Sequence, residues 1–143
     1  PIFIDAITDM SIADANDILF GGIDTAATAY LRNTSYNTLF TTYEPKIDNA
    51  LQQVTVGGTS ISQTYEDFVA DYNSTLAIGI PGFGTLGSLM NLQSISVSDL
   101  SAYSTNKGLD GLFLKIAEEE QDIRTNPLAR INDLLVKVFS LLD

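Results

Sequence analysis

The chain has 143 residues, of which 18 are acidic and seven basic, so its net charge at pH 7 is −11. It contains no histidine and no cysteine. This composition excludes disulfides, thiolate nucleophiles, imidazole or zinc–thiolate metal sites, and Ser-His-Asp or Cys-His catalysis. With 45% apolar residues, the chain is long enough to bury a core, and we predict a single helical domain over residues 1–143.

The acidic surplus is uneven along the chain. Residues 1–100 hold eleven acids and two bases, whereas residues 101–143 hold seven acids and five bases. Nucleic acids and anionic membranes attract Lys and Arg, so the sequence argues against both partners. A solubilising acidic surface is the simplest interpretation.

Helix start signals open the chain. Ser11 and Asp14 have the spacing of a capping box and predict a helix over 11–20, which Gly21-Gly22 would end. Asp24 is placed to cap a second helix. We expect Ser35 to start a third, which Pro45 should kink or split.

A small β-hairpin is an alternative interpretation of residues 54–61. Gly57-Gly58, flanked by alternating apolar residues, is typical of a small β-hairpin, although an isolated two-stranded hairpin is only marginally stable. A capping-box spacing at Thr64–Asp67 then predicts a helix over 65–76.

A run of 27 residues from Tyr72 to Ser98 carries no charge. Its glycines and proline argue against a membrane-spanning helix. We predict an apolar, glycine-rich loop over 76–92, which is either partly buried or a contact surface for a protein partner, for another copy or for a missing N-terminal segment. The residues of that candidate interaction surface are Ile78, Ile80, Phe83, Leu86 and Leu89.

The last two helices have the clearest periodicity. The spacing at Ser96–Asp99 predicts a helix over 97–124, and Asn126 followed by Pro127 predicts the start of the next. Apolar residues recur at helical spacing in both. We expect the two stripes to pack together as an antiparallel hairpin, which completes an all-α fold of about six helices.

The segment Gly82–Gly87 matches the dinucleotide-binding pattern G-x-G-x-x-G. That pattern needs a strand before it, a helix after it and a βαβ unit around it. The match lies among predicted helices and follows Pro81, so we reject the cofactor interpretation and expect no cofactor.

Carboxylates are the remaining groups with chemistry. Glu118 and Asp122 are four residues apart on a predicted helix, as are Asp5 and Asp9. A divalent cation on the first pair is one interpretation, but a solvated helix face is the simpler one, and no calcium-binding loop pattern is present. Glu120 and Arg124, also four residues apart, are placed to form an ordinary ion pair on the helix. A set of polar residues is expected to form ion pairs that fix the last two helices: Lys107, Asp110, Arg124 and Arg130.

Several residues of the C-terminal third carry a family resemblance: Lys107, Leu109–Phe113, Ile116–Glu120, Ile123-Arg124, Asn126-Pro127 and Ala129-Arg130. With these residues the sequence resembles a bacterial family, the domain of unknown function 4197. The resemblance covers residues 1–56 and 97–139, and residues 57–96 match poorly. Gly108 departs from the family, which usually has alanine there. The resemblance implies a further segment before Pro1 and an exported, periplasmic location.

Three functions fit these observations. The leading one is a non-enzymatic structural or interaction module, with self-assembly as one form of it. The second is a carrier of a small apolar ligand in a cavity between helices. The residues expected to line that cavity are Phe40, Tyr43, Phe83, Phe113 and Phe139. The third is the carboxylate metal site at Glu118 and Asp122.

Overall fold

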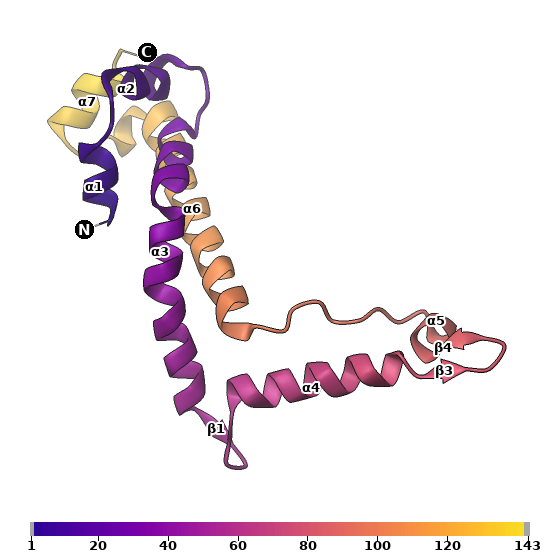
Figure 1. Ribbon diagram of the computed structural model, residues 1–143. Coiled ribbons are helices and arrows are strands. Elements are labelled where there is room, and N and C mark those ends of the chain that lie inside the picture. Colours follow the sequence, from indigo (N-terminus) through magenta and orange to yellow (C-terminus); the bar gives the residue numbers. More distant parts are fainter. Residues whose placement is uncertain (1, 142–143) are drawn as a thin grey trace. The chain divides into compact units, whose positions relative to one another are not determined.

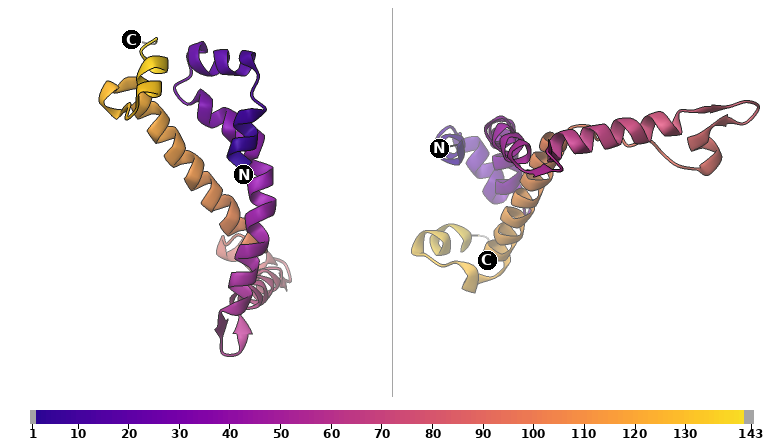
Figure 2. Two further views of the ribbon diagram at one scale, coloured as in Figure 1. Left: turned by 90° about the vertical axis from the view of Figure 1, so that its left-hand side faces the viewer. Right: turned by 90° about the horizontal axis from the view of Figure 1, so that it is seen from below.

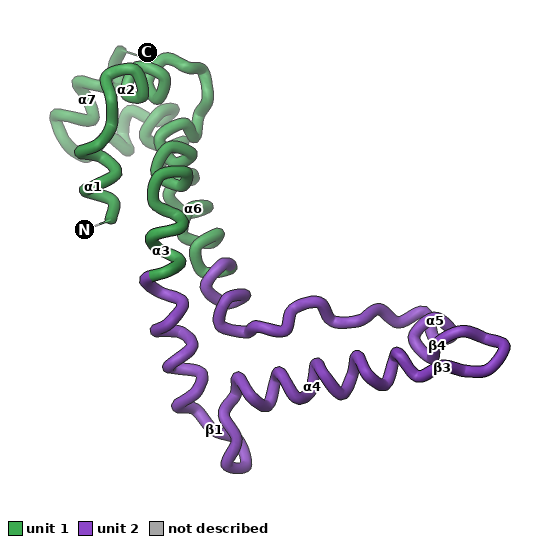
Figure 3. The backbone as a smooth tube through the Cα atoms, viewed as in Figure 1, with its two compact units in different colours: residues 1–41, 107–143 green, residues 42–106 purple. Residues whose placement is uncertain are grey.

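The computed structural model describes residues 2–141 and is mostly helical, as the sequence predicted (Figure 1). These residues divide into two compact units (Figure 3). Unit 1 comprises residues 1–41 and 107–143, and unit 2 comprises residues 42–106. The single domain over residues 1–143 stays a prediction, and each unit is described by itself.

Two short helices begin unit 1, α1 (Ile2–Thr8) and α2 (Ile12–Phe20). The predicted capping box of α2 is confirmed. The Ser11 side chain accepts the Asp14 amide at 3.1 Å, and the Asp14 carboxylate accepts the Ser11 amide at 3.0 Å. The Ser11 hydroxyl, which donates to the Asp14 carboxylate at 2.6 Å, and the Ser11 amide lower the pKa of Asp14. Local sequence therefore determines where α2 begins.

The long helices α3 (Ala26–Gln53) and α6 (Leu100–Thr125) pack antiparallel. Within unit 1 their contact is the core, where Phe113 is 2% exposed and packs with Leu39 and Leu109. Phe113 meets Phe3 of α1 edge-on at 6.2 Å between ring centroids and stacks on Tyr36 at 6.1 Å. One aromatic ring thus joins three helices, with geometries favoured by ring quadrupoles.

Helix α3 is continuous where we expected a new start at Ser35 and a break near Pro45. Ser35 is buried, and its hydroxyl donates to the Leu31 carbonyl at 2.5 Å, so it bonds back to the helix and caps nothing. Pro45 removes one amide donor from the helix interior. Packing along α3 outweighs that local loss, which a sequence pattern does not reveal.

Unit 2 contains the same arrangement twice, a hairpin of two-residue strands that leads into a helix (Figure 1). Strands β1 (Thr55–Val56) and β2 (Thr59–Ser60) precede α4 (Ile61–Leu76), and β3 (Gly79–Ile80) and β4 (Gly84–Thr85) precede α5 (Leu86–Met90). In both, the last strand residue is the helix N-cap: Ser60 accepts the Gln63 amide and Thr85 accepts the Ser88 amide.

The hairpin that we considered for residues 54–61 is present in the structure. Gly57 and Gly58 form its two-residue turn with φ of 62° and 91°, which glycine adopts at little cost. Helix α4 consequently begins at Ile61, earlier than the Thr64 spacing predicted. The segment 76–92 is also more ordered than the predicted loop, because it contains the second hairpin and α5.

The start of α6 differs from the predicted cap. Asp99, rather than Ser96, accepts the Ala102 amide at 2.8 Å, and α6 begins at Leu100. The hydrogen bonds from Ala102 and Ser101 lower the pKa of Asp99. The residue we assigned to the third helical position is therefore itself the cap.

After α6 the chain turns through a 3-10 helix (Pro127–Ala129) into α7 (Asp133–Phe139), as the colours of Figure 2 show. Asn126 accepts the Leu128 amide at 3.1 Å, which confirms the predicted cap. We expected all the apolar residues after Pro127 to pack against the preceding helix. This is wrong for Leu128, Ile131 and Leu134, which are exposed. The early turn and the short length of α7 leave these residues outside the core.

Two glycines give opposite predictions for stability. Gly108 lies inside α6 with no atom within 4 Å of an added Cβ, so Gly108→Ala should stabilise the protein by about 0.5–1 kcal/mol.

An added Cβ at Gly87 would lie 3.2 Å from the Leu76 Cβ and 3.3 Å from two backbone oxygens. Gly87→Ala should therefore lower the melting temperature, measured by circular dichroism. Equal shifts of one sign in both variants would contradict this account.

Candidate functional site

Unit 1 contains a buried carboxylate, that of Glu120, whose exposed fraction is 7%. It accepts the Ala27 amide at 2.9 Å, the Thr28 amide at 2.7 Å and the Thr28 hydroxyl at 2.7 Å. These amides belong to the first turn of α3, where backbone donors have no partner within the helix. Glu120 of α6 therefore caps α3, the role we had assigned to Asp24.

Arg124, one turn along α6, completes this site. Its guanidinium donates to Glu120 through Nε at 2.9 Å and through a terminal nitrogen at 2.7 Å, as the sequence predicted. The same terminal nitrogen also donates to the Ile18 carbonyl of α2 at 2.7 Å. The guanidinium carbon lies 5.5 Å from the centroid of the Phe139 ring of α7. Four helices of unit 1 thus meet at one ion pair.

The pKa of Glu120 is the outcome of opposing effects. Burial raises it, but the hydrogen bonds from Ala27, Thr28 and Arg124 outweigh burial and hold the pKa below its ordinary value of 4.5. The carboxylate is accordingly charged at neutral pH. Both oxygens of the carboxylate accept hydrogen bonds from neighbouring residues, so the arrangement has the character of a structural site rather than a reactive one.

Arg130 was predicted to join an ion-pair network with an acid. The structure shows that it donates to the Ile123 carbonyl at 3.1 Å and the Arg124 carbonyl at 3.2 Å. These are terminal carbonyls of α6, where a cation also meets the negative end of the helix dipole. Arg130 therefore fixes the turn between α6 and α7.

The other members of the predicted network lie further along α6. Asp110 forms an ion pair with Arg32 of α3 at 2.7 Å. The predicted network named Lys107, three residues away on α6, and did not include Arg32. Arg32 lies over the Tyr36 ring at 4.8 Å and the Phe113 ring at 5.5 Å. The half-exposed pair and its cation–π contacts cover the aromatic core.

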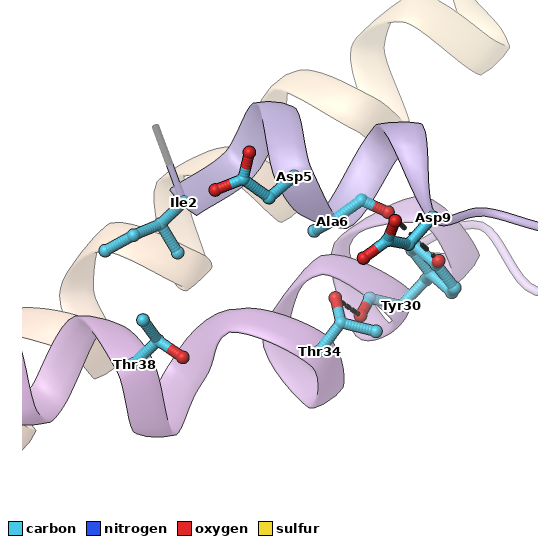
Figure 4. Close-up of a pocket in the computed structure, with 7 residues that line it drawn as sticks. All are labelled: Ile2, Asp5, Ala6, Asp9, Tyr30, Thr34 and Thr38. Carbon is cyan, nitrogen blue, oxygen red and sulfur yellow. Dashed lines mark hydrogen bonds between the residues drawn. The ribbon is translucent and has the colours of Figure 1, made fainter.

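A pocket of about 280 Å³ lies between α1 and α3 in unit 1 (Figure 4). Asp5 of α1 and Asp9 of the turn after α1 line one side, and Tyr30, Thr34 and Thr38 line it from α3. The Tyr30 hydroxyl donates to the Ala6 carbonyl at 3.1 Å.

The chemistry of this pocket is limited by its groups. Both carboxylates come from the same side of the pocket, Asp5 from α1 and Asp9 from the turn after it, so they do not flank a bound molecule as an acid–base pair must. Burial and the charges of Asp14 and Asp9 raise the pKa of Tyr30, and its phenol stays protonated at neutral pH. The pocket therefore offers polar oxygens without an opposed proton donor and acceptor.

The weak metal prediction at Glu118 and Asp122 gains no support from their neighbours. Glu118 binds Lys115 at 2.5 Å, and Asp122 accepts the Asn126 side-chain amide at 3.2 Å. Within residues 2–141 no group of three or more Asp, Glu, His or Cys side chains is placed to hold a metal ion. The ordinary pairing on a solvated helix face accounts for both residues.

The predicted ligand-lining aromatics are not gathered in a cavity between helices. Phe113 is enclosed in the core of unit 1, whereas Tyr43 and Phe83 are 47% and 70% exposed. The helical period places residues on a face of their own helix but does not tell which helix covers that face. The predicted lining is therefore wrong for Tyr43 and Phe83.

The glycine-rich match at residues 82–87 has a structural explanation in unit 2. Gly82 and Gly84 belong to the β3–β4 hairpin, and Gly87 packs against Leu76. The strands are antiparallel and two residues long, unlike the parallel unit that a dinucleotide requires.

The predicted interaction surface lies on this same hairpin and α5. Ile78, Phe83 and Leu89 are exposed, and Ile80 and Leu86 are partly buried. Met90 and Leu92 add further exposed apolar area. The backbone beneath them is fixed by hydrogen bonds from Leu86 to Ile78 and from Leu92 to Gly87, both 2.9 Å.

Sequence reasoning missed the residues that act over long separations. Thr28 is 92 residues from Glu120, and Asn73 of α4 exchanges two 2.8 Å hydrogen bonds with the Ile95 backbone. The available signals were weak. An acid in a helix interior and an asparagine in an uncharged run each suggest a buried partner without naming it.

The pKa of Glu120 gives a pH-dependent prediction. Glu120→Gln removes a buried charge from Arg124 and should lower the free energy of unfolding by about 3 kcal/mol at pH 7. Because the folded-state pKa lies below the ordinary 4.5, the carboxylate's contribution is present above that value. It is lost as the pH falls through the folded-state pKa.

Urea unfolding of both proteins between pH 7 and pH 3 measures this difference. The gap between wild type and Glu120→Gln should narrow below pH 4.5. The neighbouring exposed Glu119→Gln is the matched control and should show little change. A gap that stays constant down to pH 3 would contradict the proposed role.

Comparison with known proteins agrees with the resemblance seen in the sequence. Neither the curated proteins nor the solved structures contain a match to the chain. Residues 1–140 match a family model described as protein of unknown function (DUF4197). The match includes residues 57–96, where we expected the weakest resemblance, and covers essentially the whole chain. The chain therefore belongs to the DUF4197 family.

Proposed function

We propose that the protein is a non-enzymatic interaction module that associates with a second copy of itself through the surface of residues 78–92. The observation that carries the proposal is the exposure of large apolar side chains in this segment of unit 2: Ile78, Phe83, Leu89, Met90 and Leu92. An apolar cluster of this kind on a fixed backbone is typical of a protein contact.

Charge favours a second copy at this particular surface. Each chain carries a net charge of −11, so two copies repel each other wherever acidic surfaces meet. Residues 72–98 contain no charged side chain. Two copies related by a two-fold axis can bring this segment together without burying an unpaired carboxylate.

The contact surface is also held in shape before binding. Gly87 allows α5 to approach Leu76 of α4, and the backbone bonds of Leu86 and Leu92 fix the hairpin to α5. A surface with little conformational freedom loses little entropy on association. An exported location is part of the same proposal, supported only by the family resemblance.

The remaining candidates have less support. Transport of an apolar ligand requires an enclosed apolar cavity, and the exposed Tyr43 and Phe83 do not contribute to one. A pocket of about 490 Å³ near Arg32 and Asp110 is lined in part by this ion pair. No helix within residues 2–141 combines the length and apolarity needed to span a membrane.

Multi-angle light scattering of the purified protein tests the proposal. We expect an oligomer that becomes a folded monomer in the double variant Phe83→Ser and Leu89→Ser, since both side chains are exposed and absent from the core. Self-association should strengthen when sodium chloride is raised from about 0.05 to 0.5 M, because salt screens repulsion between the acidic chains.

The matched control is the double variant Ile12→Ser and Leu128→Ser in unit 1, where both side chains are at least 90% exposed. It should leave the mass unchanged. A wild-type protein that is monomeric at all salt concentrations, or a control that dissociates equally, would refute self-association through residues 78–92.

A further inference from the structure

Helix α4 carries an acidic row of side chains next to an aromatic row. Asp67-Phe68 and Asp71-Tyr72 repeat the same acid–aromatic pair four residues apart, so both acids lie in one row and both aromatics in the next. The rings of Phe68 and Tyr72 stack at 6.0 Å with planes 25° apart. Phe68 is 56% exposed.

The opposite side of α4 is occupied. Val69 is buried, the Tyr65 hydroxyl donates to the Val97 carbonyl at 2.9 Å, and Asn73 bonds the Ile95 backbone. The extended segment 92–99 thus covers that side. The acidic row of Asp67 and Asp71 lies opposite this packing, and the aromatic row lies between the two, with Phe68 exposed and Tyr72 partly buried.

The acidic row is unfavourable for the isolated helix. Like charges four residues apart destabilise a helix, and α4 contains no lysine or arginine to offset them. Unit 2 as a whole holds six acids and one base. One oxygen of Asp67 accepts the Gln63 side-chain amide at 2.8 Å, and a carboxylate retains further acceptor positions.

We propose that this face of α4 binds a basic helical segment of another protein that presents two arginines four residues apart. A guanidinium stacks on an aromatic ring and donates two parallel hydrogen bonds to a carboxylate. The two acid–aromatic pairs repeat with the spacing that brings arginines to one helix face. Each arginine would occupy one pair.

The occupant is not a second copy of this chain. Its lysines and arginines stand at positions 32, 46, 107, 115, 124, 130 and 137, and no two of them are four residues apart. A nucleic acid is excluded by the acidic row, because phosphates bind Lys and Arg. The surface is also separate in sequence from residues 78–92, so this inference does not depend on self-association.

Fluorescence anisotropy with a labelled alanine-based peptide that carries two arginines four residues apart measures the binding. Asp71→Asn should weaken the dissociation constant about tenfold, and Phe68→Ala about threefold. Replacing both arginines of the peptide with lysine should also weaken binding, because the ammonium group does not stack or form a fork.

Two matched controls separate the site from general attraction. Glu66→Gln removes one charge on the opposite side of the same helix, and Phe20→Ala removes a ring that is also 56% exposed. Both should leave the dissociation constant within about twofold, as expected for side chains outside the contact.

Thermal stability distinguishes loss of contact from loss of structure. Asp71→Asn relieves the repulsion with Asp67 and should raise the melting temperature while it weakens binding. The inference is overturned if the wild-type protein does not bind the arginine peptide, if the lysine peptide binds equally well, or if Glu66→Gln weakens binding as much as Asp71→Asn.

Discussion

Unit 1 depends on one buried carboxylate at the start of a helix. Two amides of α3 need an acceptor, and the Glu120 side chain supplies it from α6, while Arg124 balances its charge and holds the Ile18 carbonyl. Removing any partner leaves another buried polar group unsatisfied. The ion pair therefore specifies how α2, α3 and α6 meet more than it adds net stability, because burying two charges has a large cost of its own.

The sequence predicted what is determined locally. The Ser11–Asp14 capping box, the Asn126 cap and the Glu120–Arg124 pair each involve residues two to four positions apart, and all three are present. The caps predicted at Ser96 and Asp24 failed because competing acceptors were available. Asp99 is three residues from Ser96, and Glu120 is far along the chain. Local patterns name suitable residues but do not choose among distant competitors.

The interruption predicted at Pro45 failed for a related reason. A proline removes one hydrogen bond and adds a steric cost of about 3 kcal/mol in an isolated helix. Helix α3 runs through it, and the residues before the proline are held in place by Glu120 and the aromatic core at one end and by the Glu44–Ser101 hydrogen bond of 2.7 Å next to the proline. Tertiary contacts outweigh helix propensity, and they involve partners more than fifty residues away.

Charge is distributed in unit 2 in a way that separates two kinds of surface. The acids of α4 end at Asp71, and the uncharged run begins with the next residue. An acidic face attracts cations and keeps copies of the chain apart, whereas an uncharged apolar surface permits copies to meet. Because α4 lies between the two hairpins in sequence, one helix carries the first surface and positions the second through Leu76 and Gly87. Neither surface uses Glu120, Arg124 or Phe113, so changes at these surfaces leave the contacts that stabilise unit 1 intact.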